Sequence, residues 1–192
     1  MADDNNQYPF AGYKQILGEI FAKVMLKAPC HILDVGIGTG TLAAKLYEAG
    51  NIITGIDFSD EMLKIAKAKM PDARLIRHNF TKGLPIEFAE TFEKFDFIIS
   101  TYALHHLTDE EKPVFIEAAS KLLAPNGLIL IGDVAFATHE MHDECRAGAE
   151  DGWDDDEFYI IYENLSKFLG GHLKTNYQQI SHCGGLLEVR PQ

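Results

Sequence analysis

Three glycines at alternate positions, Gly36, Gly38 and Gly40, lie in the stretch ILDVGIGTG, directly after a short apolar run. Glycine allows a chain to turn sharply, and it allows a ligand to approach the backbone closely. Where such a turn joins a strand to a helix, backbone N–H groups and the helix N-terminus meet at one point, which suits nucleotide-like ligands. The spacing therefore indicates a site for a nucleotide-derived cofactor.

Two carboxylates narrow the class of cofactor. Asp57 ends the next apolar run, where its oxygens can accept hydrogen bonds from both hydroxyls of a ribose. The dinucleotide pattern G-x-G-x-x-G would need its third glycine at position 41. In this chain that position is Thr41, and the third glycine comes one residue earlier, at position 40. Asp34 precedes the turn, where it would repel a pyrophosphate and attract a cation. We therefore interpret the stretch as a site for S-adenosylmethionine, which carries a sulfonium, and disfavour a nicotinamide-dependent oxidoreductase.

The elements that position these residues alternate between short apolar runs and amphipathic segments. The segments that predict strands are 31–35, 51–57, 73–80, 94–100 and 127–136, followed by an antiparallel pair over 172–180 and 184–191. The segments that predict helices are 13–27, 41–50, 59–70, 109–125 and 157–170. Strands that alternate with helices form a parallel sheet with helices on both faces. The sequence therefore predicts an α/β fold, with a looser segment over 81–93.

Length, composition and charge limit the classes of partner and the domain organisation that we expect for the chain. Its 192 residues predict a single domain, with a leading helix in 10–28, a cofactor-binding core in 30–136, an acidic loop and helix in 137–170 and a strand pair in 171–192. Acidic residues outnumber Lys and Arg by 29 to 17, which disfavours nucleic acid and anionic membranes as partners. The three widely spaced cysteines predict no disulfide framework. We expect a cytoplasmic monomer or homodimer.

Four segments together resemble one known family. ILDVGIGTG and the following IDFSDEML resemble the first two motifs of class I S-adenosylmethionine-dependent methyltransferases, and more narrowly the small bacterial YrrT-like methyltransferases. FDFIISTYALHHLTDEEK and KLLAPNGLILIGDVAF are similar to the segments around the fourth and fifth strands of that family. The resemblance implies a Rossmann-like fold with a mostly parallel seven-stranded sheet and a C-terminal antiparallel hairpin. It also implies methyl transfer to a small-molecule acceptor by in-line displacement, with S-adenosylhomocysteine as the product.

The same resemblance assigns residues to the cofactor. It places Asp34 near the methionine portion, Asp57 at the ribose, and Phe58 and Met62 beside the adenine. Asn79 stands where the family usually has an acid that accepts from the adenine amine, and a neutral amide is a weaker acceptor. The full set that the resemblance assigns is Asp34, Gly36, Gly38, Gly40, Asp57, Phe58, Met62, Asn79, Phe80 and Ser100.

Candidate catalytic residues follow the fourth and fifth strands. His105 and His106 come directly after the fourth strand, and an imidazole can take a proton from the acceptor near neutral pH. His106 is the preferred candidate base, and the alternative interpretation is that one histidine packs against the next helix while the other lies in solvent. Tyr102 is either a catalytic residue or a wall of the pocket. Asp133, at the end of the fifth strand, is a further candidate.

The polar segment after residue 136 permits several interpretations. His139 and His142 would share one helical face, but without a further ligand at a defined spacing we predict no metal. Eight carboxylates lie between residues 143 and 157, and we expect most of them to be solvated. The alternative is that these acids and Trp153 admit a cationic acceptor such as an amine. We expect no chemical role for His31, His78, His172, His182 and the three cysteines.

The sequence leaves two questions undecided: what covers the site, and whether the protein catalyses a reaction. Only about ten residues precede the leading helix, so the site is open, closed by residues 137–157 or covered by a neighbouring subunit, or the chain is a shortened piece. A protein that binds the cofactor as a sensor or partner module, without turnover, is the alternative to an enzyme. It stays open because Asn79 departs from the family pattern and no residue is unmistakably a base.

Overall fold

A mostly parallel β-sheet forms the middle of the computed structural model, which describes residues 6–90, 94–149 and 152–192. Within these residues seven strands follow the order β3-β2-β1-β4-β5-β8-β7, and the two-residue β6 pairs with the end of β5. Only β8 and β7 run antiparallel to their neighbours. The strands are β1 (His31–Val35), β2 (Ile52–Asp57), β3 (Arg74–Arg77), β4 (Phe95–Thr101), β5 (Leu123–Phe136), β6 (Ile160–Ile161), β7 (Leu173–Gln179) and β8 (Gly184–Pro191). The predicted fold class is confirmed, with β6 as an addition.

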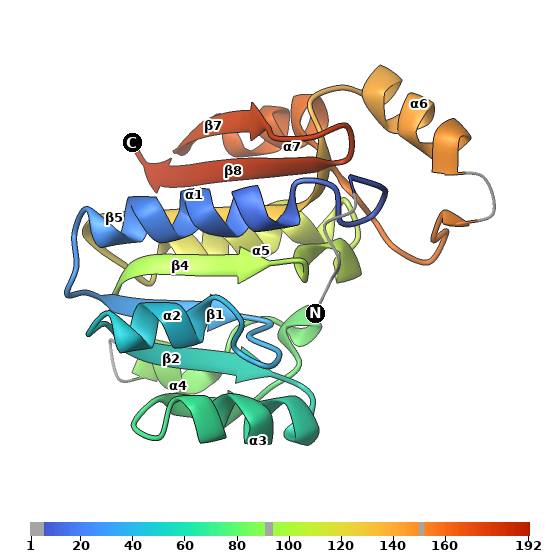
Figure 1. Cartoon of the computed structure of the whole chain (residues 1–192). Helices are drawn as coiled ribbons and strands as arrows, with labels where there is room; N and C mark the ends of the chain where they lie inside the picture. Colours follow the sequence, from blue (N-terminus) through green and yellow to red (C-terminus); the bar gives the residue numbers. More distant parts are fainter. Residues whose placement is uncertain (1–5, 91–93, 150–151) are drawn as a thin grey trace.

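Helices cover both faces of this sheet (Figure 1). Buried side chains of α1, α2 and α3 form one core against β1, β2 and β4, whereas those of α4, α5 and α7 form a second core on the opposite face. The helical elements are α1 (Tyr13–Met25), α2 (Ala43–Glu48), α3 (Asp60–Lys69), η1 (Phe80–Lys82), α4 (Ile86–Glu90), η2 (Leu104–His106), α5 (Glu111–Ser120), α6 (His139–Ala149) and α7 (Tyr162–Leu169). None of these helices combines the length and the apolar character needed to cross a membrane.

Local sequence explains most element boundaries. The residues of β1 and β2 are almost continuously buried, as expected for parallel strands with helices on both faces. Ser59 begins α3 as an N-cap, because its hydroxyl accepts a hydrogen bond from the backbone N–H of Met62. The last two strands were expected over 172–180 and 184–191, and in the structure β7 ends at Gln179 and β8 begins at Gly184.

Two predictions after β5 are corrected. The helix expected over 157–170 begins only at Tyr162, because Ile160 and Ile161 extend alongside Ala135 and Phe136 as β6. The segment 137–157, expected to be an acidic loop, contains the eleven-residue helix α6. In the looser segment 81–93, η1 and α4 form short helical turns, and residues 91–93 lie outside the described residues.

Candidate functional site

The carboxyl ends of four parallel strands meet at one edge of the sheet. Parallel pairing of β1 with β2 and β4, and of β4 with β5, places Asp34, Asp57, Ser100 and Asp133 near the ends of their strands at this edge. In Figure 1 the N-terminal segment and α6 lie at the same edge. Open α/β sheets bind ligands at this edge, where the chain order reverses.

Asp34 is a buried carboxyl without a complete set of partners. It is 2% exposed, and its Oδ1 has no hydrogen-bond partner in the described structure. Burial, with a smaller contribution from the charge of Asp57, raises its pKa to about 8. Burying a polar group without a partner costs free energy, so a ligand with a cationic or N–H group would stabilise this carboxylate.

The glycine turn brings the backbone close to the sheet and leaves one position open. Gly36 has a φ of 71°, and a Cβ there would lie 2.5 Å from the Cβ of Ala103. Gly38 also has a positive φ, but a Cβ there would meet nothing closer than the Gly36 carbonyl oxygen at 4.0 Å. Gly40 packs against Met70 of the segment after α3. The turn is therefore packed at both ends and open at Gly38, where a ligand can reach the backbone.

Asp57 holds this turn in place. Its Oδ2 accepts a hydrogen bond from the Gly38 N–H at 2.8 Å, and its Oδ1 accepts one from the Ser59 N–H at 2.9 Å. A carboxylate oxygen has two lone pairs, so both oxygens keep capacity for ribose hydroxyls. The structure thus adds an anchoring role to the residue that the sequence assigned to the ribose.

The remaining cofactor candidates differ in what they offer a ligand. Phe58 and Met62 are 61% and 41% exposed, which leaves an apolar surface beside Asp57. The Asn79 Oδ1 accepts from both the N–H and the hydroxyl of Thr81, so it caps η1 instead of pointing to an open acceptor position. Phe80 is buried in the core, and the Ser100 hydroxyl donates to the Val35 carbonyl at 3.0 Å.

On the other side of the site, a buried carboxylate orients a histidine. Asp133 is fully buried, and its Oδ1 lies 2.7 Å from the Nδ1 of His105. The same carboxylate accepts from the backbone N–H groups of Leu104 and Val134. The His105 Nε2 lies 3.4 Å from Glu157. Burial alone would lower the pKa of His105, but the two carboxylates more than offset it and raise the pKa.

His106 differs from its neighbour in exposure and charge. Its side chain is exposed, and its ring centroid lies 4.4 Å from that of His105. Partial burial of the ring, followed by the positive charge of His105, lowers the pKa of His106. At a given pH these shifts favour the neutral, proton-accepting form of His106 and the protonated form of His105.

Aromatic side chains pack together near these histidines, and the Tyr159 ring lies 6.4 Å from that of His105. Tyr102 has a φ of 52° and packs its ring against Tyr13 at 5.0 Å. Trp153 stacks on Tyr8 at 4.9 Å and meets Tyr159 edge-on, while the hydroxyls of Tyr8 and Tyr159 are hydrogen-bonded to each other. The N-terminal segment and the acidic segment therefore pack against each other beside the site.

Sequence reasoning missed the part played by Glu157. The sequence predicts that most of the acids in this segment are solvated, and Asp154, Asp155 and Asp156 are indeed exposed. Glu157, in contrast, is half-buried and faces His105. Its position directly before the apolar run FYII is a signal that it could be drawn inward. Glu150 and Asp151, two of the eight predicted acids, lie outside the described residues.

The two histidines of α6 do not converge on one point. The His139 Nε2 accepts a hydrogen bond from the Asn164 amide at 2.7 Å. The His142 Nδ1 lies 2.9 Å from Asp143, and its ring meets Trp153 edge-on. The weak histidine pattern in this helix therefore corresponds to separate surface contacts.

Comparisons with known proteins identify the family of the chain. Residues 32–127 match the family model described as a methyltransferase domain. The chain is 42% identical over 141 residues to an uncharacterized methyltransferase from Bacillus thuringiensis, covering 73% of this chain and 62% of the relative. It is 39% identical over 131 residues to one from Oceanobacillus iheyensis, covering 68% and 57%. The chain thus spans about three fifths of the length of these relatives.

A solved structure shares the fold at low sequence identity. Magnesium protoporphyrin IX methyltransferase from Synechocystis, determined with bound SAH, superposes with a TM-score of 0.72 at 18% identity. The superposition covers 94% of this chain and 84% of that enzyme. This likeness shows that the two chains share a fold over nearly the whole length of this chain.

Proposed function

Because the chain belongs to the methyltransferase domain family, we propose that it is an S-adenosylmethionine-dependent methyltransferase that acts on a small-molecule acceptor. The observation that carries this proposal is the buried Asp34 carboxyl, whose Oδ1 has no partner, beside a glycine turn that is open at Gly38. A cationic ligand satisfies both features, whereas an anionic pyrophosphate would face an uncompensated carboxylate.

The chain's own residues divide the work of holding the cofactor. When bound, S-adenosylmethionine supplies a methyl group that its sulfonium has already activated. Asp34 would attract the cationic methionine portion, and Gly38 would allow it to lie against the backbone. Asp57 would bind the ribose while it anchors the turn, and the exposed rim of Phe58 and Met62 would cover the adenine.

On the acceptor side, we assign the base to His106 and a positioning role to His105. His106 is exposed and has a lowered pKa, so it can take the proton that the acceptor loses. Asp133 holds the His105 ring, which packs against His106 and orients it. An amine is the acceptor class we favour, because Glu157 and the surrounding acids favour a cation at this edge.

Ligand binding tests the first half of this proposal. Thermal unfolding is measured with S-adenosylmethionine, S-adenosylhomocysteine and NAD in parallel. A ligand at 100 times its Kd adds about 2.7 kcal/mol, which for a chain of this size raises Tm by roughly 5 to 10 °C. We expect this shift with both adenosyl ligands and none with NAD. The absence of a shift with either adenosyl ligand would overturn the proposal.

A matched pair of glycine variants locates the binding. Gly38→Ala and Gly50→Ala both place a side chain at a positive φ in open space, so both carry a similar backbone cost. The Gly38 N–H donates to the Asp57 carboxylate, whereas the Gly50 N–H donates to the Tyr47 carbonyl at the end of α2. We expect Gly38→Ala to lose most of the thermal shift and Gly50→Ala to keep it.

Turnover tests the second half. Formation of S-adenosylhomocysteine is measured across a panel of small amines, thiols and hydroxy compounds. We expect product with at least one amine, and a loss of about 100-fold in kcat for His106→Ala with little change in cofactor affinity. Binding of adenosyl ligands without product from any member of the panel would favour the alternative of a binding module without turnover.

A further inference from the structure

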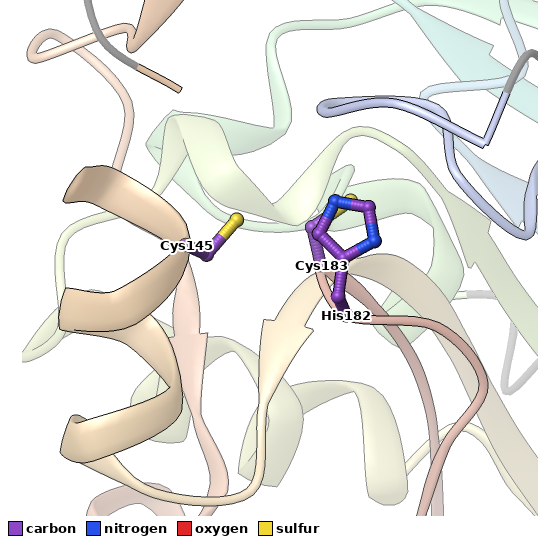
Figure 2. A group of neighbouring side chains, drawn as sticks. All are labelled: Cys145, His182 and Cys183. Carbon is purple, nitrogen blue, oxygen red and sulfur yellow. The ribbon is translucent and has the colours of Figure 1, made fainter. Parts of the chain in front are cut away.

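Two cysteines and a histidine from distant parts of the chain meet away from the glycine turn. The Sγ atoms of Cys145 and Cys183 and one ring nitrogen of His182 all lie within 4.8 Å of one another. Figure 2 shows Cys145 projecting from α6 toward the turn between β7 and β8, which carries His182 and Cys183. Both cysteines are buried, whereas His182 is exposed.

The backbone holds the turn end of this cluster firmly. The Cys183 carbonyl accepts a hydrogen bond from the Ala135 N–H of β5 at 3.0 Å. The Ser181 hydroxyl accepts from the N–H groups of Cys183 and Gly184 and donates to the Ala11 carbonyl. His182 and Cys183 are therefore presented on a rigid turn that is tied to two other segments.

The other end of the cluster comes from the helix α6. Cys145 is the one buried residue of α6, an eleven-residue helix in which every residue is described. Figure 1 shows α6 standing away from the sheet at its upper edge. Cys145 packs into a small cluster of buried side chains that includes Phe136 and Cys183, and there its thiol lies close to a second thiol and an imidazole.

A cavity gives access to these side chains from solvent. It has a volume of about 530 Å³, and Cys145, His182, Met141 and Glu144 contribute to its lining. Glu144 adds a carboxylate on the same helix, next to Cys145. The cavity therefore brings the Cys145 thiol and the His182 imidazole together with an acid and with water, and the fully buried Cys183 lies behind this lining. An acid or a water can complete a four-coordinate site.

We propose that Cys145, His182 and Cys183 form a binding site for Zn²⁺, with Glu144 or water as the fourth ligand. Zn–S and Zn–N bonds of about 2.3 and 2.0 Å place tetrahedral donors roughly 3.5 to 3.8 Å apart, so the three donors need only about 1 Å of adjustment. The exposed His182 side chain has the freedom to make it. Two thiolates and an imidazole select Zn²⁺ over Mg²⁺ or Ca²⁺, which prefer oxygen ligands.

Binding at this site would fasten α6 to the sheet. The ion replaces the two thiol protons, so each Zn²⁺ bound releases up to two protons and leaves two metal–thiolate bonds. The bonds connect α6 to the turn that the Ala135 N–H and the Ser181 hydroxyl hold in place. Because α6 leads directly into the segment of Trp153 and Glu157, the ion would steady the acidic side of the candidate site from outside it.

Metal titration of the whole reduced chain, after treatment with a chelator, is the test. We expect one Zn²⁺ per chain, and with Co²⁺ as the probe a thiolate-to-metal charge-transfer band and the intense visible bands of a tetrahedral site. We also expect Zn²⁺ to raise Tm. A Co²⁺ spectrum without the thiolate band, or the absence of stoichiometric binding, would overturn the proposal.

Variants assign the ligands independently of folding defects. His182→Ala removes an exposed side chain and should weaken Zn²⁺ binding by at least about tenfold, as should Cys145→Ser. The matched controls are His172→Ala, another exposed histidine, and Cys30→Ser, a buried thiol elsewhere that donates to the Oδ1 of the Asn51 side chain. We expect both controls to bind as the unchanged chain does.

A second cluster of potential metal ligands offers an alternative Zn²⁺ site in the same chain. His105, His106 and Glu157 also have ligand atoms within 4.8 Å of one another. If His106→Ala abolishes Zn²⁺ binding while His182→Ala and Cys145→Ser leave it intact, the ion belongs to that cluster and the proposal is wrong. It is equally wrong if the reduced chain closes a Cys145–Cys183 disulfide in air and binds no Zn²⁺ before it does so.

Discussion

Asp34 and Asp133 are both buried carboxyl groups near the ends of parallel strands, yet their surroundings are opposite. Asp34 is 2% exposed and its Oδ1 has no partner, so burial raises its pKa to about 8. Asp133 is 0% exposed, and it accepts from two backbone N–H groups and contacts the His105 ring at 2.7 Å. The half of the candidate site around Asp34 thus lacks a hydrogen-bond partner, and we call it the incomplete half. The half around Asp133 has its hydrogen-bond partners within the chain, and we call it the complete half.

This difference separates binding from positioning. A carboxyl that lacks partners gains free energy when a ligand supplies them, so the Asp34 side is suited to hold a cation that comes and goes. A carboxylate that is fully hydrogen-bonded restrains its neighbours whether or not a ligand is present. The Asp133 side is therefore suited to hold His105 and, through it, His106 in one orientation.

The largest expected effect comes from breaking the complete half. Asp133→Asn places an amide N–H₂ against donor groups, and we expect the free energy of unfolding to fall by about 3 kcal/mol. Tm should then fall by roughly 6 to 12 °C, measured by calorimetry. The control is Asp96→Asn, a partly exposed carboxylate paired with Lys27, which should cost less than about 1 kcal/mol. Equal losses in the two variants would contradict the comparison.

The incomplete half should respond in the opposite direction. In Asp34→Asn the buried ionisable group is gone, so we expect Tm without ligand to stay the same or rise by a few degrees. Affinity for S-adenosylmethionine should fall by about 50-fold, since one charge-assisted interaction is lost. Titration calorimetry and thermal unfolding together measure both effects. A large loss of Tm without ligand would mean that Asp34 is a structural residue.

The pH dependence of binding sharpens the same contrast. Below pH 8 most of the Asp34 carboxyl is protonated in the free chain, and a bound cation favours its ionised form. Affinity for S-adenosylmethionine should therefore rise with pH, by at most about tenfold per unit, and level off near pH 8. Calorimetry between pH 6 and 9 measures this, and Asp34→Asn should give a flat profile. A flat profile in the unchanged chain would contradict the assignment.

The same pKa shift has a consequence for stability. The ordinary pKa of Asp34 is 3.8, so between that value and about 8 the native chain holds a proton that the unfolded chain has lost. The contribution of this group to the free energy of unfolding therefore decreases as pH rises across that window, and it is constant above it. Asp34→Asn removes this contribution, which a comparison of urea unfolding at pH 5 and pH 8 would detect.

The smallest expected effect concerns Glu157, at the margin of the complete half. Its charge helps to raise the pKa of His105 across a distance of 3.4 Å. Glu157→Gln should lower the pKa of His105 by roughly half a unit, because the carboxylate is half-buried and partly screened. An NMR titration of the imidazole measures this shift. Cofactor affinity should not change, and a rise in the pKa of His105 would contradict the geometry.

Much of the incomplete half could be predicted from local sequence. The glycines, Asp34 and Asp57 lie within 24 residues of one another, and the pattern of strand, glycine turn, helix and parallel strand brings them together. The fold class followed from the alternation of strands and helices. The roles of Phe80 and Ser100 were harder to predict, because packing decides whether a side chain at a strand end faces the ligand or the core. In the structure both side chains turn inward.

The complete half could be predicted only in part. His105, His106 and Asp133 were candidates by their position after strands, but their separate roles depend on contacts that no local pattern records. Glu157 reaches His105 from a segment that the acidic composition marked as solvated. The helix α6 and the strand β6 were also missed, because the pairing of Ile160 and Ile161 with β5 is a long-range contact.

The sequence by itself determined the alternating fold, the glycine turn and the unusual placement of an acid before it. These depend on periodicity, backbone freedom and charge, which act over a few residues. Only the tertiary structure decided that Asp34 lacks a partner while Asp133 has several, and that Cys145 meets His182 and Cys183. Burial and hydrogen bonding depend on which distant segments meet, and those contacts set the charge and the chemistry of each group.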